Sequence, residues 1–359
     1  MKHLKIQGKA YEIGYQHGAE AKKEVHYSLD SYERLFHHEK NIGWNEAREI
    51  AKDHINYLDR HGDGFLEEIE GIAKGASVDF EDILALNTRS EVALTGNTDG
   101  CTSFGVISPG SGNLFLSQTW DWRPSQKRSL LTLDIETDGT EVVMVTEAGI
   151  LGKIGMNNHG LGVCLNALRV NDRQPTLPIH ITLRKILNSG DIDEALEIIQ
   201  NKEVASAANL LVGQDDSDSM RRIVNNEVTV THIDSREITK TGHVYHTNHI
   251  CSPEILDNLE TEHSSHENSY QRLEKIDELI STAIEENEPI NHQQIREWLS
   301  NHDNAPYTIC RHGGNPARSH YTDTVTAFGI SMNLTKRNLH IMEGTPCSPT
   351  GTHYHEFSS

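Results

Sequence analysis

The residues of this sequence best suited to chemistry are Gly100 and Cys101, in the run NTDGCTSF (residues 97–104), where a polar turn ends and a strand-like stretch begins. Glycine permits a strained backbone, and a thiol that follows glycine can attack its carbonyl in an N-to-S acyl shift. Hydrolysis of that thioester would leave Cys101 as a new N-terminus. The alternative is that Cys101 is a small buried core residue, as free cysteines usually are.

A nucleophile at a chain terminus carries its own base. The α-amino group, with a pKa of about 7.7–8.0, can take the thiol proton near neutral pH without a histidine partner. N-terminal threonine nucleophiles use the same arrangement. The residues alone therefore leave two possibilities for Cys101: a core cysteine, or a nucleophile freed by self-cleavage after Gly100 that attacks an amide carbonyl.

The predicted secondary structure changes from helix to strand close to this junction. Residues 10–95 carry apolar side chains at mostly helical spacings, which predicts a helical segment. From residue 101 to residue 167, short β-rich runs separated by Gly- and Asn-containing turns predict a meander of antiparallel strands. Residues 178–201 return to helix, with Asp191 as an N-cap.

The second half of the chain continues with a block of strands, a block of helices and a final hairpin. Residues 208–248 are predicted to form strands, residues 268–302 helices, and residues 323–344 a hairpin with its turn at 336–338. Helices and strands in blocks, without regular βα alternation, indicate an α+β fold with helices layered over antiparallel sheets. The length suits two domains of about 150 residues or one large layered domain.

The composition excludes some partners. The 359 residues include 32 Lys and Arg against 53 Asp and Glu, so the formal net charge at pH 7 is −21. Nucleic-acid binding requires clustered basic residues, so we expect no nucleic-acid partner, and anionic membrane surfaces are disfavoured as well. The N-terminal residues lack the apolar run of a signal peptide, and no window resembles a membrane helix. We expect a cytoplasmic protein.

The cysteines are odd in number, scattered, and without a CxxC pair, which argues against a disulfide framework and for free thiols. They are Cys101, Cys164, Cys251, Cys310 and Cys347. Cys164 lies in an apolar run and is expected to pack in the core.

Five blocks follow one another along the chain: DGCTSFG, TWDW, VTEAGILGKIGMNNHGLGVCLNAL, VYHTNH and PYTICR; a GYQHG segment lies within the helical N-terminal part. In order and spacing they resemble the isopenicillin-N acyltransferase (acyl-CoA:6-aminopenicillanic acid acyltransferase-like) family of N-terminal-nucleophile cysteine hydrolases. The resemblance implies a four-layer αββα sandwich and a precursor cut before the cysteine. Residues 1–100 and 101–359 would then be the alpha and beta fragments of one co-folded unit.

The resemblance also implies site residues. Asn248 matches an oxyanion-hole asparagine, although an asparagine after a strand is also common in turns. Asp121 matches an acid near the nucleophile that would orient the α-amino group or a substrate amine. Strand alternation puts Asp121 on the opposite face from Trp120 and Trp122, and an exposed strand Asp is the alternative.

An arginine beside the nucleophile is implied as well. Arg311 keeps the ICR context, whereas Arg318 lies where the sequence departs from the family pattern, so either could serve, or either could be a surface cation. Trp122 and Arg311 are the expected substrate-binding residues. Trp120, Trp122 and Phe104 could line an acyl pocket, although aromatic residues in strands are more often core.

Histidines at 243, 246 and 249, and at 353 and 355, raise the question of a metal site. Zinc sites normally need three or four ligands in suitable geometry, and residues spaced by three along a strand or turn scatter over both faces. The Gly-rich run at 149–155 lacks the GK[ST] ending of a phosphate-binding loop. We therefore expect no metal and no cofactor.

The leading hypothesis is a self-processing cysteine amidohydrolase or acyltransferase that acts on a small N-acyl or peptide-like amide through a Cys101 acyl-thioester. Water or an acceptor amine would release the acyl group, and acyl-CoA is an alternative donor; hydrolysis is favoured because water is always present. The alternatives are a bile-salt-hydrolase or penicillin-acylase-like amidase of the same superfamily, and a non-catalytic protein that retains the fold.

Overall fold

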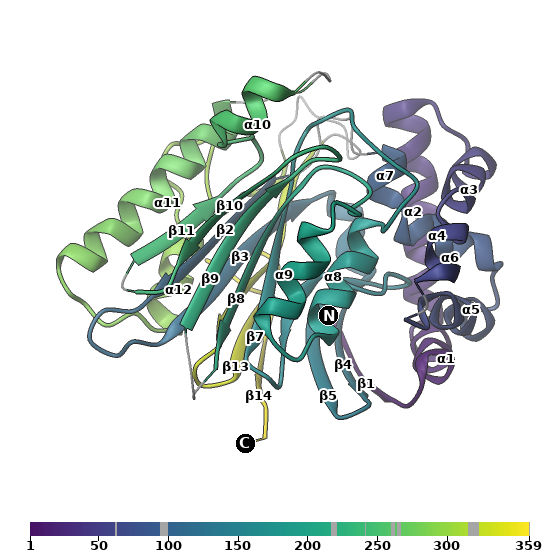
Figure 1. The fold of residues 1–359 in the computed structure, drawn as a ribbon, viewed down its shortest axis with the longest axis horizontal. Coiled ribbons are helices and arrows are strands. Elements are labelled where there is room, and N and C mark those ends of the chain that lie inside the picture. Colours follow the sequence, from purple (N-terminus) through teal and green to yellow (C-terminus); the bar gives the residue numbers. More distant parts are fainter. Residues whose placement is uncertain are drawn as a thin grey trace.

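The structure is a computed structural model that describes residues 1–61, 63–93, 100–216, 221–240, 242–259, 263, 267–314 and 323–358. Residues 97–99 of the junction and Arg318 lie outside the described residues. Two sheets stack face to face, with helices on the outer face of each, which gives the four-layer αββα arrangement of an α+β protein (Figure 1). The fold class predicted from the sequence is confirmed.

One sheet has eight strands in the order β1-β4-β5-β6-β7-β8-β9-β10. Neighbouring strands are antiparallel except for β1 and β4, which are parallel. Its strands are β1 (Lys2–Gln7), β4 (Leu130–Thr137), β5 (Thr140–Glu147), β6 (Ile154–Asn157), β7 (Leu161–Ala167), β8 (Ala208–Asp215), β9 (Arg221–Val228) and β10 (Ile233–Ile238).

The other sheet has six strands, all antiparallel, in the order β11-β2-β3-β12-β13-β14. They are β2 (Gly100–Ile107), β3 (Leu114–Trp122), β11 (Gly242–His246), β12 (Val325–Asn333), β13 (Asn338–Glu343) and β14 (Gly351–Glu356). β2 and β3 face β7 and β8 of the larger sheet. Both β2 and β3 are buried along their whole length, as strands covered on both faces must be.

The helices divide into three groups (Figure 1). α8 and α9 cover the eight-stranded sheet, α11 and α12 cover the six-stranded sheet, and α1 to α7 pack together at one side. They are α1 (Ala10–Glu20), α2 (Lys22–Lys40), α3 (Trp44–Lys52), α4 (Ile55–Arg60), α5 (Phe65–Ala76), α6 (Phe80–Asn87), α7 (Arg89–Ala93), α8 (Ile179–Asn188), α9 (Ile192–Gln200), α10 (Pro253–Asn258), α11 (Glu267–Glu285) and α12 (His292–Leu299).

The GYQHG segment forms part of α1, and its glycines allow very close packing against α5. A Cβ at Gly14 would lie 2.0 Å from the Glu68 carbonyl oxygen, and a Cβ at Gly18 would lie 2.1 Å from that of Ile72. Both helices therefore meet backbone to backbone, and larger residues at these positions would force them apart.

Several predicted elements need correction. The strands of residues 101–167 are antiparallel, but they do not form one meander, because β2 and β3 belong to the six-stranded sheet and β4 to β7 to the other. The connection between β12 and β13 runs over residues 334–337, slightly before the predicted turn. The sequence reasoning missed β1, β14 and α10. The Asp191 N-cap is confirmed, since its carboxylate accepts a hydrogen bond from the Glu194 N–H.

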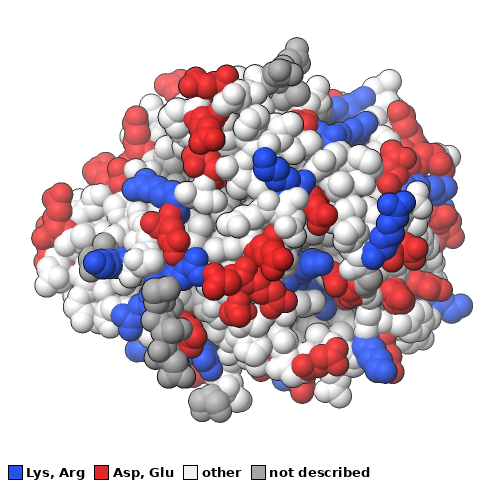
Figure 2. Space-filling model, in the orientation of Figure 1, with Lys and Arg blue, Asp and Glu red and all other residues white. Residues whose placement is uncertain are grey.

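Charge is mixed on the surface. On the face that Figure 2 shows, the described Lys and Arg side chains stand singly or in small groups among Asp and Glu side chains. Among the described residues, no helix has the length and apolar character needed to cross a membrane.

Candidate active site

The pairing of β2 with β3 determines what surrounds the Gly100–Cys101 bond. Cys101 lies opposite Trp120 and Gly100 lies opposite Asp121. Because neighbouring residues of a strand point to opposite faces, the thiol and the Asp121 carboxylate lie on different sides of the sheet. Cys101 is 2% exposed and borders a small cavity, which is lined by Arg89, Ser90, Cys101, Trp120, Leu165, Ala167 and Ile179.

Two side chains fix the backbone of Cys101. Its N–H donates to the Asn248 Oδ1 atom at 2.9 Å, and its carbonyl oxygen accepts from the Arg272 Nη1 atom at 2.5 Å. Arg272 also donates from Nη2 to the Asn248 Oδ1 atom at 2.8 Å and from Nη1 to the Thr102 hydroxyl at 3.0 Å. The nucleophile candidate is thus held from both its nitrogen and its carbonyl side.

The orientation of the Asn248 amide follows from its neighbours. Oδ1 accepts from two donors, and Nδ2 donates to the Ala167 carbonyl oxygen at 3.2 Å. The Asn248 N–H donates to the Ser269 hydroxyl at 2.8 Å, which anchors the backbone at this position. An amide NH2 has two donor hydrogens, so one remains for a further acceptor. This geometry is compatible with the predicted oxyanion role, and it adds a contact with the Cys101 nitrogen.

Asp121 is fully buried, so it is not the exposed strand residue that we considered as an alternative. Its Oδ1 accepts from the Thr326 hydroxyl at 2.6 Å, and its Oδ2 lies 4.0 Å from the Arg311 Nε atom. Burial raises the pKa of Asp121, against the opposing effects of Arg311, Arg272 and the Thr326 hydrogen bond. Oδ2 has no hydrogen-bond partner among the described residues. A carboxyl group of this kind is suited to proton exchange.

Gly100 is required for space rather than for backbone strain, which corrects our reading of the sequence. It is not among the glycines with positive φ, and it pairs regularly within β2. A Cβ at this position would lie 2.8 Å from Asp121 Oδ2 and 3.3 Å from Arg311 Nη1. Arg311 therefore lies beside the Gly100–Cys101 bond.

Arg272 contacts the Cys101 backbone, and the sequence reasoning did not single it out. It lies on α11 and is fully buried, and burial lowers its pKa to about 10, with Arg311 as a further cause. Arg272, Ile276 and Ile280 are spaced by four and all face inward. A cation on the apolar stripe of a helix is the signal that could have identified it.

The aromatic residues of the region separate into two groups. Trp120 borders the cavity beside Cys101, and Trp122 stacks against it with ring centroids 5.6 Å apart. Trp122 thus lies behind Trp120, although we named it as a substrate-binding candidate. Phe104 packs against Trp298 in a different apolar cluster, away from the cavity.

A buried charged network adjoins Trp120. The Lys153 Nζ atom lies 3.4 Å from the Trp120 ring centroid and 2.5 Å from Glu147 Oε2, which also accepts from Arg89 at 3.2 Å. Burial by itself would raise the pKa of Glu147, but the positive charges of Arg89 and Lys153 have the larger effect. Together they hold the pKa of Glu147 below its usual range. Lys153, in the glycine-rich run at 149–155, is therefore buried against Trp120, which lines the cavity. The sequence of this run predicted turns and gave no sign of a buried lysine.

The histidines considered as metal ligands have separate partners. His243 contacts Asp277 at 2.8 Å, His246 contacts Glu227 at 3.1 Å, and the His249 Nδ1 atom contacts the Ser269 hydroxyl at 2.8 Å. The histidines near the C-terminal end also differ in their neighbours, since the His353 ring makes a tilted contact with the His3 ring and His355 lies 3.4 Å from Glu141. The histidines of one run do not share a ligand position with each other, but His246 groups with Glu227 and Cys251, and His355 groups with Asp134 and Glu141, with ligand atoms within 4.8 Å of one another. Cys164 is fully buried on β7, as expected.

Comparison with known proteins extends over most of the chain. A profile of the family described as acyl-coenzyme A:6-aminopenicillanic acid acyl-transferase matches residues 108–344. The acyl-coenzyme A:6-aminopenicillanic-acid-acyltransferase 40 kDa form of Emericella nidulans is 30% identical over 369 aligned positions, which cover 100% of this chain and 97% of that protein.

Solved structures with a similar arrangement are more distant. A mutant conjugated bile acid hydrolase from Clostridium perfringens aligns with a TM-score of 0.48 and 10% identity, over 71% of this chain and 92% of that one. Penicillin V acylase from Agrobacterium tumefaciens aligns with a TM-score of 0.38 and 12% identity, over 71% of this chain and 86% of that one.

The profile match and the full-length relative agree with the blocks recognised in the sequence. This chain belongs to the acyl-coenzyme A:6-aminopenicillanic acid acyltransferase family and is an enzyme that acts on amide bonds.

Proposed function

We propose that this enzyme cuts its own Gly100–Cys101 bond and then uses Cys101 as an N-terminal nucleophile on small N-acyl or peptide-like amides. The observation that carries the proposal is the anchoring of the Cys101 backbone by Asn248 and Arg272 at the wall of a cavity. A nitrogen that must act as a base needs a fixed position, because proton transfer depends on geometry. A cysteine that only fills a core needs no such anchoring.

In the processing step, the Cys101 thiolate attacks the Gly100 carbonyl carbon. The bond between that carbon and the Cys101 nitrogen breaks, and the nitrogen takes a proton and becomes an α-amino group. Water then hydrolyses the thioester to a Gly100 carboxylate and a free thiol. We assign Asp121 the proton exchange beside Gly100, since its buried carboxyl group has a raised pKa.

In the turnover step, the α-amino group takes the thiol proton, and the thiolate attacks the substrate carbonyl carbon. The developing oxyanion accepts a hydrogen bond from the remaining N–H of Asn248, the C–N bond of the amide breaks, and the leaving amine takes the proton. The acyl-thioester is then released to water or to an acceptor amine. Arg272 positions both Cys101 and Asn248 throughout.

The lining of the cavity suggests the chemistry of the acyl group. Trp120, Leu165, Ala167 and Ile179 form the apolar part of the cavity lining, and Arg89 and Ser90 form its polar part. We infer that the acyl portion of the substrate is small and mostly apolar. Acyl-CoA is the second candidate donor, in line with the name of the Emericella nidulans relative. Hydrolysis of amides remains our first choice, because water is always available as acceptor.

Intact mass spectrometry tests this proposal. The wild-type protein should yield fragments of residues 1–100 and 101–359, and incubation with an N-acyl amide or acyl-CoA should add an acyl mass to the larger fragment. Cys101→Ala should stay one chain and take up no acyl group.

Cys164→Ala is the matched control, because Cys164 is equally buried on the facing sheet and should leave both reactions unchanged. A wild-type chain that persists uncut with an unreactive Cys101 would favour the non-catalytic alternative. An active Cys101→Ala variant would disprove the nucleophile assignment.

A further inference from the structure

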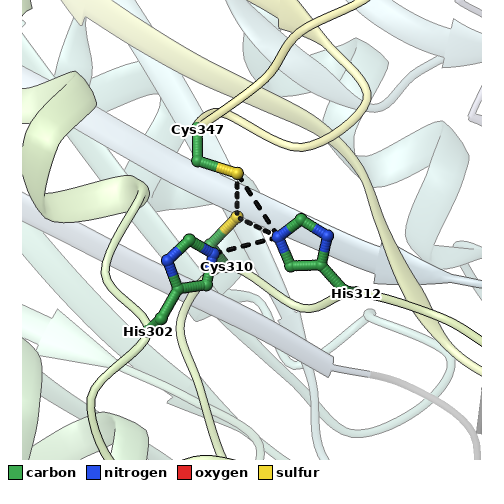
Figure 3. Close-up of side chains that lie close together, drawn as sticks. All are labelled: His302, Cys310, His312 and Cys347. Atoms are coloured by element: carbon green, nitrogen blue, oxygen red, sulfur yellow. Dashed lines mark hydrogen bonds between the residues drawn. The ribbon is translucent and has the colours of Figure 1, made fainter.

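Two cysteines and two histidines meet at one point outside the cavity beside Cys101 (Figure 3). His302 follows α12, Cys310 and His312 flank Arg311, and Cys347 lies between β13 and β14. Figure 3 shows the two sulfur atoms and the two imidazole rings turned toward one another. The four ligand atoms all lie within 4.8 Å of one another.

The separations fit a tetrahedral metal centre. Metal–sulfur bonds of about 2.3 Å and metal–nitrogen bonds of about 2.05 Å at tetrahedral angles place two sulfurs about 3.8 Å apart, sulfur and nitrogen about 3.6 Å, and two nitrogens about 3.3 Å. The Cys310 and Cys347 Sγ atoms are 3.6 Å apart. The His312 Nε2 atom lies 3.9 Å from the Cys310 Sγ atom, 3.3 Å from the Cys347 Sγ atom and 3.0 Å from the His302 Nε2 atom.

Without a metal ion, these four side chains are poor hydrogen-bond partners for one another. A thiol is a weak donor and a weak acceptor, and two imidazole nitrogens can share only one proton between them. Thiolate and imidazole together are a ligand set preferred by Zn²⁺ and Co²⁺, whereas Mg²⁺ and Ca²⁺ prefer oxygen. Four protein ligands also leave no open position, which is typical of structural rather than catalytic zinc sites.

We propose that His302, Cys310, His312 and Cys347 bind one Zn²⁺ ion in a closed tetrahedral site. On binding, the two thiols become thiolates and release their protons to solvent, while each imidazole donates the lone pair of Nε2. This proposal departs from the expectation of no metal, which considered only histidines close together in the sequence. The ligands here come from separate segments, and spacing alone does not bring them together.

A metal ion at this site would fix the position of the Arg311 backbone. Arg311 lies between the ligands Cys310 and His312, its N–H donates to the Thr326 hydroxyl at 2.8 Å, and its carbonyl oxygen accepts from the Thr326 N–H at 3.0 Å. The ion would join this segment to the connection between β13 and β14 through Cys347. The role of the ion would therefore be to position the segment that contains Arg311. Metal binding can be measured independently of catalytic activity.

Metal titration of the full-length reduced protein tests the site, with Zn²⁺ and Co²⁺ alone as probes. We expect one tightly held Zn²⁺ per chain after dialysis. Co²⁺ should give the intense visible bands of a tetrahedral ion together with thiolate-to-cobalt absorption in the near ultraviolet. Added Zn²⁺ should displace Co²⁺ and abolish these bands.

Cys347→Ser and His312→Gln should lose the stoichiometric ion and the cobalt spectrum, whereas Cys164→Ala, a change at a core cysteine outside the cluster, should retain both. Cys347 and His312 lie in loops, and far-ultraviolet circular dichroism confirms that each variant is folded. The proposal is overturned if the wild-type protein holds no stoichiometric metal, if the spectrum survives in Cys347→Ser, or if Cys310 and Cys347 form a disulfide in place of a metal site.

Discussion

Gly100 and Asp121 face each other across β2 and β3 with no room for a side chain at position 100. A Cβ there would lie 2.8 Å from Asp121 Oδ2 and 3.0 Å from Asp121 Cβ. Asp121 cannot easily move aside, because Thr326 holds its other oxygen at 2.6 Å. The residue before the proposed cut is therefore fixed by the acid beside it.

Gly100→Ala should slow self-cleavage for this reason. The added methyl group displaces Asp121 or the strand, at a cost of about 1–3 kcal/mol for overpacking, and so misaligns the Gly100 carbonyl. Denaturing gel electrophoresis of samples taken over time gives the rate of conversion to two fragments. Gly43→Ala is the control, because a Cβ at Gly43 meets nothing within 4 Å; equal rates for both variants would contradict the steric requirement.

Asn248→Asp should separate the acceptor role of the Asn248 side chain from its donor role. A carboxylate can still accept from the Cys101 nitrogen and from Arg272, but it has no hydrogen to donate to an oxyanion. We expect the chain to process itself while kcat falls about 100- to 1000-fold, the usual effect of removing an oxyanion donor. The measurement is steady-state hydrolysis of an N-acyl amide by the processed variant, and an unchanged kcat would reject the oxyanion role.

Arg311→Gln should impair the enzyme more than Arg318→Gln. Arg311 is the cation beside Asp121, so its loss leaves a buried carboxylate with less compensation. We expect turnover to fall about 10- to 100-fold, equivalent to about 1.4–2.7 kcal/mol in activation free energy. Comparing kcat/KM for the two variants decides between the arginines that the sequence left open, and a larger loss in Arg318→Gln would reverse the assignment.

The stability of the protein should depend on pH through His17. Its Nε2 atom accepts from the Gly149 N–H at 3.0 Å, and burial, with a smaller effect of Arg184, lowers its pKa from 6.5 to about 3. The folded state therefore holds His17 neutral. Its contribution to stability is fully present above about pH 6.5 and is lost as the pH falls toward 3.

Wild-type protein should accordingly lose about 2 kcal/mol more stability than His17→Gln between about pH 7.5 and pH 5. Chemical unfolding of both proteins at the two pH values gives this difference, and subtraction removes the titration of the carboxyl groups that they share. If the two proteins lose the same amount, His17 does not titrate in this way.

The sequence predicted the layers of the fold because their signals are local. Apolar spacing identified most helices, short β-rich runs identified most strands, and Asp191 identified a helix start. The division of β2 and β3 from β4 to β7 could not be predicted in this way, since the choice of sheet depends on contacts between strands far apart in the sequence. β1 was missed because its pattern is short and mixed with lysines.

The site was predictable only in part for a similar reason. Gly100, Cys101 and Asn248 lie in recognisable blocks, and the structure brings Asn248 onto the Cys101 nitrogen. Arg272 lies in a helix whose pattern looked purely structural, and only its contacts with the Cys101 carbonyl and Asn248 reveal its place. The steric need for glycine at position 100 could not be predicted either, because it depends on Asp121 of the paired strand β3.

The parallel pairing of β1 with β4 has a practical consequence for handling the protein. Residues 1–100 supply one strand to a sheet whose other strands all come from residues 101–359, and Arg89 of the same segment is bound to the buried Glu147. If the chain is cut after Gly100, an affinity tag placed before Met1 should therefore still retrieve the larger fragment. Denaturant, rather than salt, should be needed to elute the two polypeptides separately.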